Sequence, residues 1–127
     1  MTIKEIKLYE KLHAQLEGLY NEVANLSKKS PDDAVNKFKL KFINGLLKEI
    51  NKFLKDESKP FNDFISFEEN EVPTNSDVVL ILAQYLSCLE KLRADNISFR
   101  YGNWHWDVSD SSDEKIRTAP PKKIQEK

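Results

Sequence analysis

Apolar residues in the first part of the chain recur at alternating steps of three and four, which is the spacing of one helix face. The pattern predicts a helix over about Thr2 to Lys28. Its seam consists of Tyr9, Leu12, Leu16, Leu19, Val23 and Leu26. A seam with this period favours packing against a nearly parallel or antiparallel neighbouring helix. The chain is therefore expected to form a helical bundle.

Two later segments carry the signals of further helices. Ser30–Asp33 is typical of a helix start, with a capping serine, a proline in the first helical position and two acids. This second helix is expected to reach about Lys55. Thr74 and Asp77 form a capping-box pattern before a third helix, which is expected to end near Asp95.

Residues 97–108 are predicted to form a β-hairpin, with Gly102 and Asn103 as its two-residue loop. In this register Phe99 lies opposite Trp106, and Arg100 lies opposite His105. Because side chains alternate along a strand, the apolar residues share one side and the polar ones the other. The apolar side is expected to cover the helical core. It consists of Ile97, Phe99, Tyr101, Trp104, Trp106 and Val108.

The predicted fold is mainly α, with three long helices in an antiparallel up-down-up bundle and a small C-terminal β-hairpin. Residues 1–108 are expected to form one domain. Residues 109–127 are expected to be a polar, flexible tail, because they hold too little apolar surface to offset the entropy of ordering. Both a monomer and a helical homodimer that pairs part of the first helix remain open.

Composition excludes several classes of function. The 20 basic and 21 acidic residues nearly cancel, so no overall charge attracts nucleic acid or anionic lipid. Cys88, the single cysteine, cannot form an internal disulfide and is expected to be a small core residue. No signal-like N-terminus and no apolar run of about 20 residues appears. The sequence predicts a cytoplasmic protein without membrane contact.

Two charged segments are candidate binding sites. On the second helix a narrow stripe of lysines could neutralise phosphates, although a solvated helix face is the favoured interpretation. The stripe comprises Lys37, Lys41, Lys48 and Lys52, and it has no arginine and no expected exposed aromatics beside it. The connection at 56–73 is acidic and could contact a basic partner. It includes Glu68, Glu69 and Glu71.

The polar side of the hairpin is the third candidate. Arg100, His105 and Asp107 could form a small cluster that binds an anion or acts as an acid–base pair, because histidine titrates near neutral pH. The Arg100-to-His105 spacing resembles the catalytic motif of the small helical HEPN-type ribonucleases, over six residues. In that family the motif sits on a helix and a polar residue usually follows the arginine. Here Tyr101 follows it, so ordinary cross-strand pairing is favoured.

No combination of nucleophile and base appears, and nothing in the sequence predicts a metal or cofactor. We therefore expect a small non-enzymatic protein-interaction module of adaptor, regulatory or immunity type, which acts through its surface on a protein partner. The alternative is a nucleic-acid-binding or RNA-cleaving helical protein that uses the lysine stripe together with Arg100 and His105.

Overall fold

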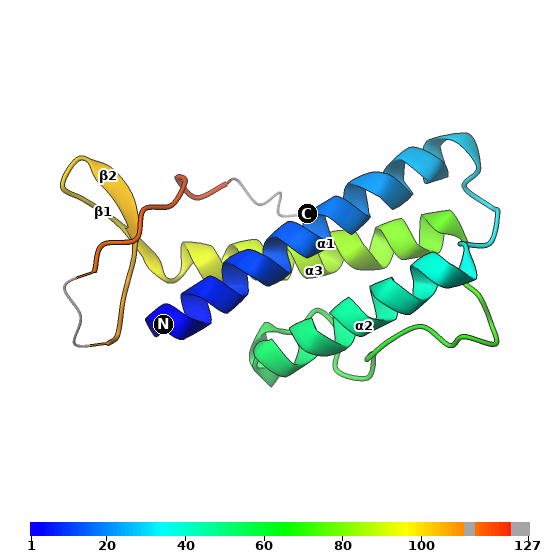
Figure 1. Cartoon of the computed structure of the whole chain (residues 1–127), viewed down its shortest axis with the longest axis horizontal. Helices are drawn as coiled ribbons and strands as arrows, with labels where there is room; N and C mark the ends of the chain where they lie inside the picture. The colour runs from blue at the N-terminus through cyan, green and yellow to red at the C-terminus, as the bar shows by residue number, and fades with distance from the viewer. Residues whose placement is uncertain (111–113, 123–127) are drawn as a thin grey trace.

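The computed structural model describes residues 1–110 and 114–122. Its elements are three α-helices, one short 3-10 helix and a two-stranded antiparallel hairpin (Figure 1). The fold class is therefore confirmed. In chain order the elements are α1 (Ile3–Lys29), α2 (Lys37–Phe53), η1 (Asp56–Ser58), α3 (Asn75–Ala94), β1 (Ile97–Arg100) and β2 (Asn103–Trp106).

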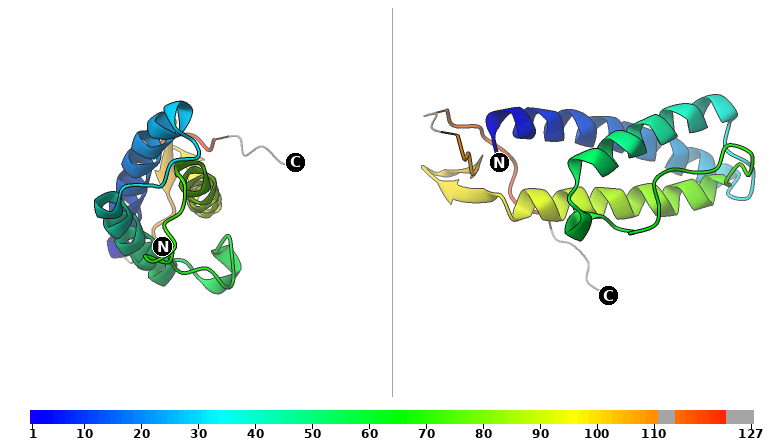
Figure 2. Two further views of the ribbon diagram at one scale, coloured as in Figure 1. Left: turned by 90° about the vertical axis from the view of Figure 1, so that its right-hand side faces the viewer. Right: turned by 90° about the horizontal axis from the view of Figure 1, so that it is seen from below.

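The direction of α3 differs from the expected up-down-up order. Helices α2 and α3 begin at the same end of the molecule, where Ala34 and Thr74 form an antiparallel bridge. At the other end the Tyr9 ring lies 6.3 Å from that of Phe53, while its hydroxyl donates to the carbonyl of Leu89. Both later helices thus run antiparallel to α1, and the order is up-down-down (Figure 2).

The long connection between α2 and α3 is the reason for this order. A 17-residue helix such as α2 is about 25 Å long. An extended chain covers more than about 3 Å per residue, so residues 54–74 can return along the whole length of α2. The sequence shows this length but not the path that the connection takes.

Helix α2 begins later than the capping signal at Ser30 indicated. Asn36 is the N-cap, and its side chain accepts hydrogen bonds from the backbone N–H groups of Phe38 and Lys39. The stretch before it caps α3 instead. The N–H of Asn75 donates to the carbonyl of Asp33 at 2.9 Å, and the N–H of Ser76 donates to that of Pro31 at 3.1 Å. These carbonyls satisfy first-turn donors that α3 itself cannot pair.

Two buried asparagines of α2 hold the connection in place. Asn44 makes two hydrogen bonds with the backbone of Phe67, through its Nδ2 at 3.0 Å and its Oδ1 at 2.9 Å. Asn51 donates to the carbonyl of Ile65 at 3.0 Å and accepts from the hydroxyl of Tyr85 on α3 at 2.9 Å. The connection is thereby fixed beside both helices. Phe61, Phe64 and Phe67 are partly buried against the core.

Replacing Asn44 with alanine is expected to lower the free energy of unfolding by about 1–3 kcal/mol, because it leaves the peptide groups of Phe67 without their partners. Urea denaturation followed by circular dichroism measures this loss. Asn21→Ala is the matched control, since Asn21 is exposed on α1 and alanine favours a helix. Equal stability of the two variants would show that Asn44 does not hold the connection.

The strands of the hairpin keep their predicted sides, but the register changes. Tyr101, which was expected on the apolar side, is instead in the loop and 76% exposed. Tyr101 and Gly102 form the loop, with φ angles of 53° and 78°, as a two-residue turn of this kind requires. Phe99 therefore lies opposite Trp104, and Ile97 lies opposite Trp106. Because the loop lies one residue earlier than predicted, each residue of β1 pairs with a residue two positions earlier on β2. A shift of two positions leaves every strand side chain on the same side of the hairpin.

The apolar side of the hairpin covers the core only at its base. Ile97 and Trp106 are buried, and the indole of Trp106 meets the Tyr9 ring edge-on at 5.0 Å. Trp104 is partly buried, whereas Phe99 is 60% exposed. The loop end points away from the helices (Figure 1), so the outer residues have no core to cover.

The segment after the hairpin is more structured than its composition indicated. The N–H of Trp106 donates to the carbonyl of Ile116 at 2.9 Å, and the N–H of Thr118 donates to that of Trp104 at 3.1 Å. His105 and Arg117 form an antiparallel bridge. Residues 116–118 thus pair with the outer edge of β2. Residues 111–113 and 123–127 of the expected tail lie outside the described residues.

Candidate functional site

The polar side of the hairpin brings together two of its three expected residues. The Arg100 guanidinium lies 3.4 Å from a carboxylate oxygen of Asp107, which also accepts a hydrogen bond from the Ser98 hydroxyl at 2.8 Å. His105 is only 5% exposed, and its Nδ1 donates to the carbonyl of Asn103 at 3.1 Å. Arg100 and Asp107 are thus paired at the surface, whereas the imidazole is covered.

The backbone around Arg100 and His105 differs from that of the ribonuclease motif. Arg100 ends β1, His105 lies on β2, and the turn at 101–102 separates them. In this register Ser98, not Arg100, is the partner of His105. A cavity of about 480 Å³ borders both residues. Their polar groups, however, bond within the hairpin: the imidazole to the carbonyl of Asn103 and the guanidinium to the carboxylate of Asp107.

Glu90 and Arg93, which sequence reasoning gave no role, form the most highly bonded polar cluster among the described residues. Both lie in the last turns of α3 and are 7% exposed. Arg93 donates two hydrogen bonds to Glu90, at 2.9 and 2.8 Å. It donates three more to the Thr118 hydroxyl and to the carbonyls of Ala119 and Pro120. A guanidinium has five N–H donors, so every one of them is used.

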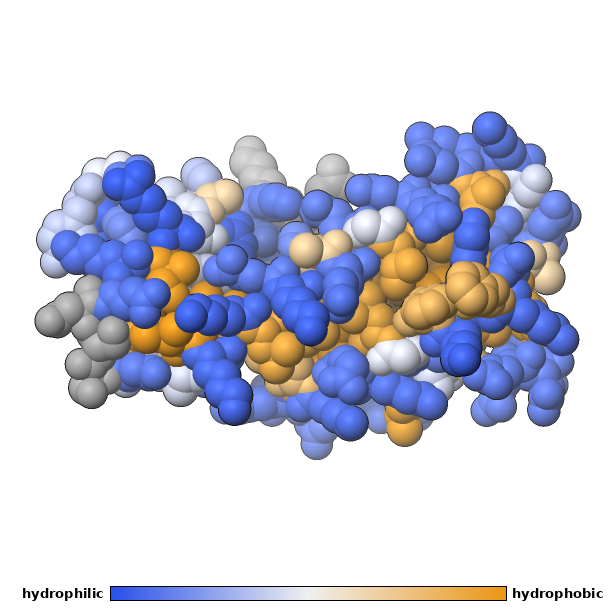
Figure 3. Space-filling view, in the orientation of Figure 1, coloured by the Kyte–Doolittle hydropathy of each residue, from blue (hydrophilic) through white to orange (hydrophobic). Residues whose placement is uncertain are grey.

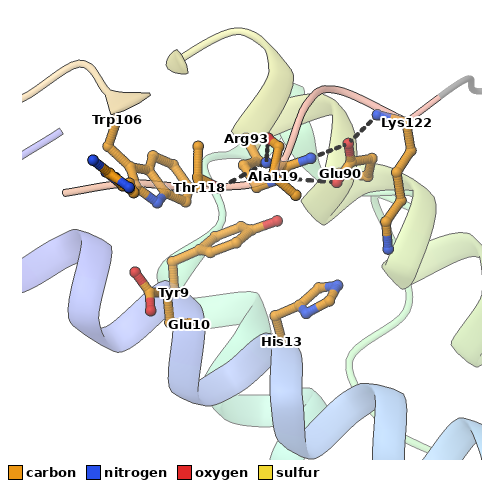
Figure 4. Close-up of a pocket in the computed structure, with 10 residues that line it drawn as sticks. Tyr9, Glu10, His13, Glu90, Arg93, Trp106, Thr118, Ala119 and Lys122 are labelled. Carbon is orange, nitrogen blue, oxygen red and sulfur yellow. Dashed lines mark hydrogen bonds and ion pairs between the residues drawn. The ribbon is translucent and has the colours of Figure 1, made fainter. Parts of the chain in front are cut away.

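We call this cluster the tail anchor: Glu90, Arg93 and residues 118–122 (Figure 4). The backbone N–H of Lys122 completes it by donating to Glu90 at 2.9 Å. A cavity of about 330 Å³ lies between the anchor and α1, where the imidazole of His13 stacks on the Tyr9 ring at 5.9 Å. The signal in the sequence was a Glu–Arg pair three residues apart near the end of α3, but nothing there showed that the tail would return to it.

The anchor also gives a pH prediction. Burial alone would raise the pKa of Glu90, but hydrogen bonds from Arg93 and Lys122 and the charge of Arg93 outweigh it and hold the pKa below 4.5. The unfolded chain therefore binds the proton more readily than the native one. The stabilisation from Glu90 is complete above about pH 4.5 and is lost as the pH falls through the lowered value. Urea titrations at successive pH values should show that the free energy of unfolding falls less on acidification for Glu90→Gln than for the wild type. The same dependence of this free energy on pH in both proteins would contradict the prediction.

An apolar groove lies between α1 and α2. Its volume is about 630 Å³, and apolar side chains gather along the line where these helices meet (Figure 3). A Cβ atom added at Gly18 or Gly45 would meet nothing within 4 Å, so neither glycine is required for packing. The groove is lined by Ala14, Gly18 and Leu19 of α1 and by Phe42, Gly45 and Leu46 of α2.

Two phenylalanines of α2 beside this groove are exposed, although the sequence predicted no exposed aromatics next to the lysine stripe. Phe38 is 70% exposed and Phe42 is 54% exposed, and their rings meet edge-on at 5.0 Å. The expected absence of exposed aromatics had favoured a plain solvated helix face over a binding role for the lysine stripe. The structure instead has an exposed aromatic pair next to the lysines.

The four candidate lysines are exposed on one side of α2. At about 100° per residue, Lys37, Lys41, Lys48 and Lys52 fall within a narrow arc next to Gly45, and Lys41 lines the groove. The acidic residues Glu68, Glu69 and Glu71 are also exposed. Within residues 1–110 and 114–122, no ion pair joins these acids to the lysines. The acidic connection therefore does not neutralise the lysine stripe through any ion pair of the described residues.

Other site chemistry is limited in the part of the chain that the structure describes. No group of three or more His, Cys, Asp or Glu side chains there could hold a metal ion. No helix there combines the length and apolar character needed to cross a bilayer. Cys88 is half-buried rather than fully enclosed, and its burial raises the pKa of the thiol.

Comparison with known proteins adds no assignment to these observations. The chain matches no known protein family, no curated protein and no solved structure.

Proposed function

We propose that this protein is a non-enzymatic interaction module that docks a helix of a partner protein in the α1/α2 groove. The observation that carries the proposal is the exposed Phe38–Phe42 pair beside an open apolar groove. Single exposed apolar residues are ordinary, but a contiguous patch with a groove marks an interaction surface. Aromatic anchors near such a groove are also typical of binding hot spots.

The shape of the groove supports a helical ligand. From Phe38 to Glu49, at its far end, α2 rises about 17 Å, which matches about three turns of a docked helix. The open space over Gly18 and Gly45 lets another backbone approach closely. Amphipathic helices occupy grooves of this kind through residues spaced three, four and seven apart.

Single-stranded RNA binding is the second candidate, because exposed aromatics beside lysines are also a feature of stacking platforms. The angle between the two rings favours the helix, because the Phe38 and Phe42 planes stand at 71° to each other and so present no common stacking face. A cytoplasmic location stays a prediction from the sequence.

The test is a selection from a displayed library of 16-residue amphipathic helical peptides with the full chain as bait. Selected peptides are expected to bind the wild type and to lose binding to the Phe38→Ser/Phe42→Ser double variant. Phe99→Ser is the matched control, because Phe99 is similarly exposed but lies on the hairpin. Peptides that bind the double variant as well as the wild type would contradict the proposal, as would a selection that yields no binder.

A second copy of the chain is the competing occupant of the groove. Analytical ultracentrifugation of the wild type and the double variant distinguishes the two cases. We expect both proteins to sediment as monomers at micromolar concentration. A wild-type dimer that the Phe38→Ser/Phe42→Ser substitutions dissociate would replace the partner helix with a homodimer.

A further inference from the structure

We infer that the partner helix is acidic along the edge that faces α2, an inference that rests on the proposed groove. Its basis is the position of the lysine stripe, which forms the outer rim of the groove beside Gly45 and the phenylalanine pair. The rim comprises Lys37, Lys41, Lys48 and Lys52. A helix seated in the groove would place its own flank within reach of these ammonium groups.

The rim carries charge that the protein itself barely compensates. Lys52 lies 3.8 Å from a carboxylate oxygen of Glu49, and both side chains are largely exposed. In the described portion of the chain, Lys37, Lys41 and Lys48 have no ion-pair partner within 4 Å. Since the net charge of the whole chain is −1, the basic rim is a local feature rather than a consequence of overall composition.

The opposite edge of the groove has a different character. On the α1 side it is lined by Ala14, Gln15 and Gly18. Glu22 of α1 pairs with Lys39 of α2 at 3.0 Å, about one helical turn beyond Gly18 and Phe42, and so joins the two helices there. The lysine that lines the groove, Lys41, belongs to α2, and no basic residue of α1 is among the residues that line it. A complementary ligand has an apolar stripe with Asp or Glu on one flank.

Electrostatic complementarity of this kind acts mainly on association and specificity. The acidic flank is therefore expected to increase the rate of binding and to make the affinity depend on salt. The apolar stripe that meets Phe38 and Phe42 supplies the affinity that salt does not remove. The two contributions can be measured separately.

The experiment uses a library with a fixed apolar stripe and with Glu, Lys, Gln or Ser at every flanking position, displayed on yeast and selected against the full chain at low salt. We expect enrichment of Glu along one flank. The selected peptide should bind Lys41→Glu/Lys48→Glu about tenfold more weakly. Lys28→Glu/Lys29→Glu, which changes the net charge equally at the end of α1, should bind as the wild type does.

The outcomes distinguish the inferred charge of the partner helix from the proposed docking of a helix in the groove. Enriched peptides with neutral or lysine-rich flanks that still require Phe38 and Phe42 would overturn the charge inference and leave the proposed function standing. Peptides that ignore both phenylalanines would overturn the proposed function itself. A single-stranded RNA oligonucleotide that binds more tightly than the peptides, and loses binding in Lys41→Glu/Lys48→Glu, would assign the rim to nucleic acid instead.

Discussion

Replacing Trp106 with alanine is expected to lower the free energy of unfolding by about 3–5 kcal/mol, as large-to-small changes of buried aromatics do. The side chain is 2% exposed and meets the Tyr9 ring edge-on at 5.0 Å. The substitution also removes the ring contact by which the base of the hairpin packs on α1. Urea denaturation followed by circular dichroism measures the loss.

Phe99→Ala is the control for this prediction, because it removes an aromatic ring from the same side of the same hairpin. Phe99 is 60% exposed, and its main ring contact is with Trp104 at 5.8 Å. Its removal is expected to cost less than about 1 kcal/mol. Equal losses for the two variants would show that the base of the hairpin does not cover the core.

The helices were predictable where local chemistry decides them. Thr2 and Thr74 are the N-caps of α1 and α3, and each forms a capping box with the acid three residues later. Ser30–Asp33 carried equally good local signals, yet α2 starts only at Lys37. The reason is tertiary structure, because carbonyls of this stretch accept hydrogen bonds from the first turn of α3. A contact between segments so far apart in the sequence cannot be predicted from local signals.

The exposed phenylalanines follow from how α2 is rotated. The apolar arc of α2 is broad, and several orientations could bury most of it. Asn44 and Asn51 are buried because the connection offers backbone groups for their amides to bond. This turns the opposite margin of the arc, with Phe38 and Phe42, toward solvent. The lysine stripe was visible in the sequence, whereas the groove beside it depended on this rotation.

For the hairpin, the sequence predicted the side on which each strand residue lies but not its cross-strand partner. Alternation alone sorted the strand residues correctly onto two sides, because a shift of two residues does not change the sorting. It failed for Tyr101, which lies in the loop with its ring against His105. The pairing of Arg100 with His105 needed the loop to be placed correctly, and the actual loop uses Tyr101 at positive φ, which is uncommon for a residue with a side chain. The cluster with Asp107 therefore formed without its histidine.

Replacing Arg93 with leucine is expected to lower the free energy of unfolding by about 3–5 kcal/mol, because it leaves the buried Glu90 carboxylate without its cation. The same change removes the donors that hold the tail at Thr118, Ala119 and Pro120. Urea denaturation measures the stability, and limited trypsin digestion measures how readily the chain is cut at Arg117 and Lys122. Faster cleavage at both sites is expected.

The double variant Glu90→Leu/Arg93→Leu provides the decisive comparison. It removes the charge together with its partner, so no buried carboxylate is left unpaired, and its loss should be smaller than that of Arg93→Leu alone. Lys91→Leu is the surface control, because its pair with Asp95 is exposed and contributes less than about 1 kcal/mol. A double variant less stable than Arg93→Leu would mean that the unpaired Glu90 is not the source of the loss. Tail cleavage should stay fast in the double variant, because the guanidinium that binds the tail carbonyls is absent in both.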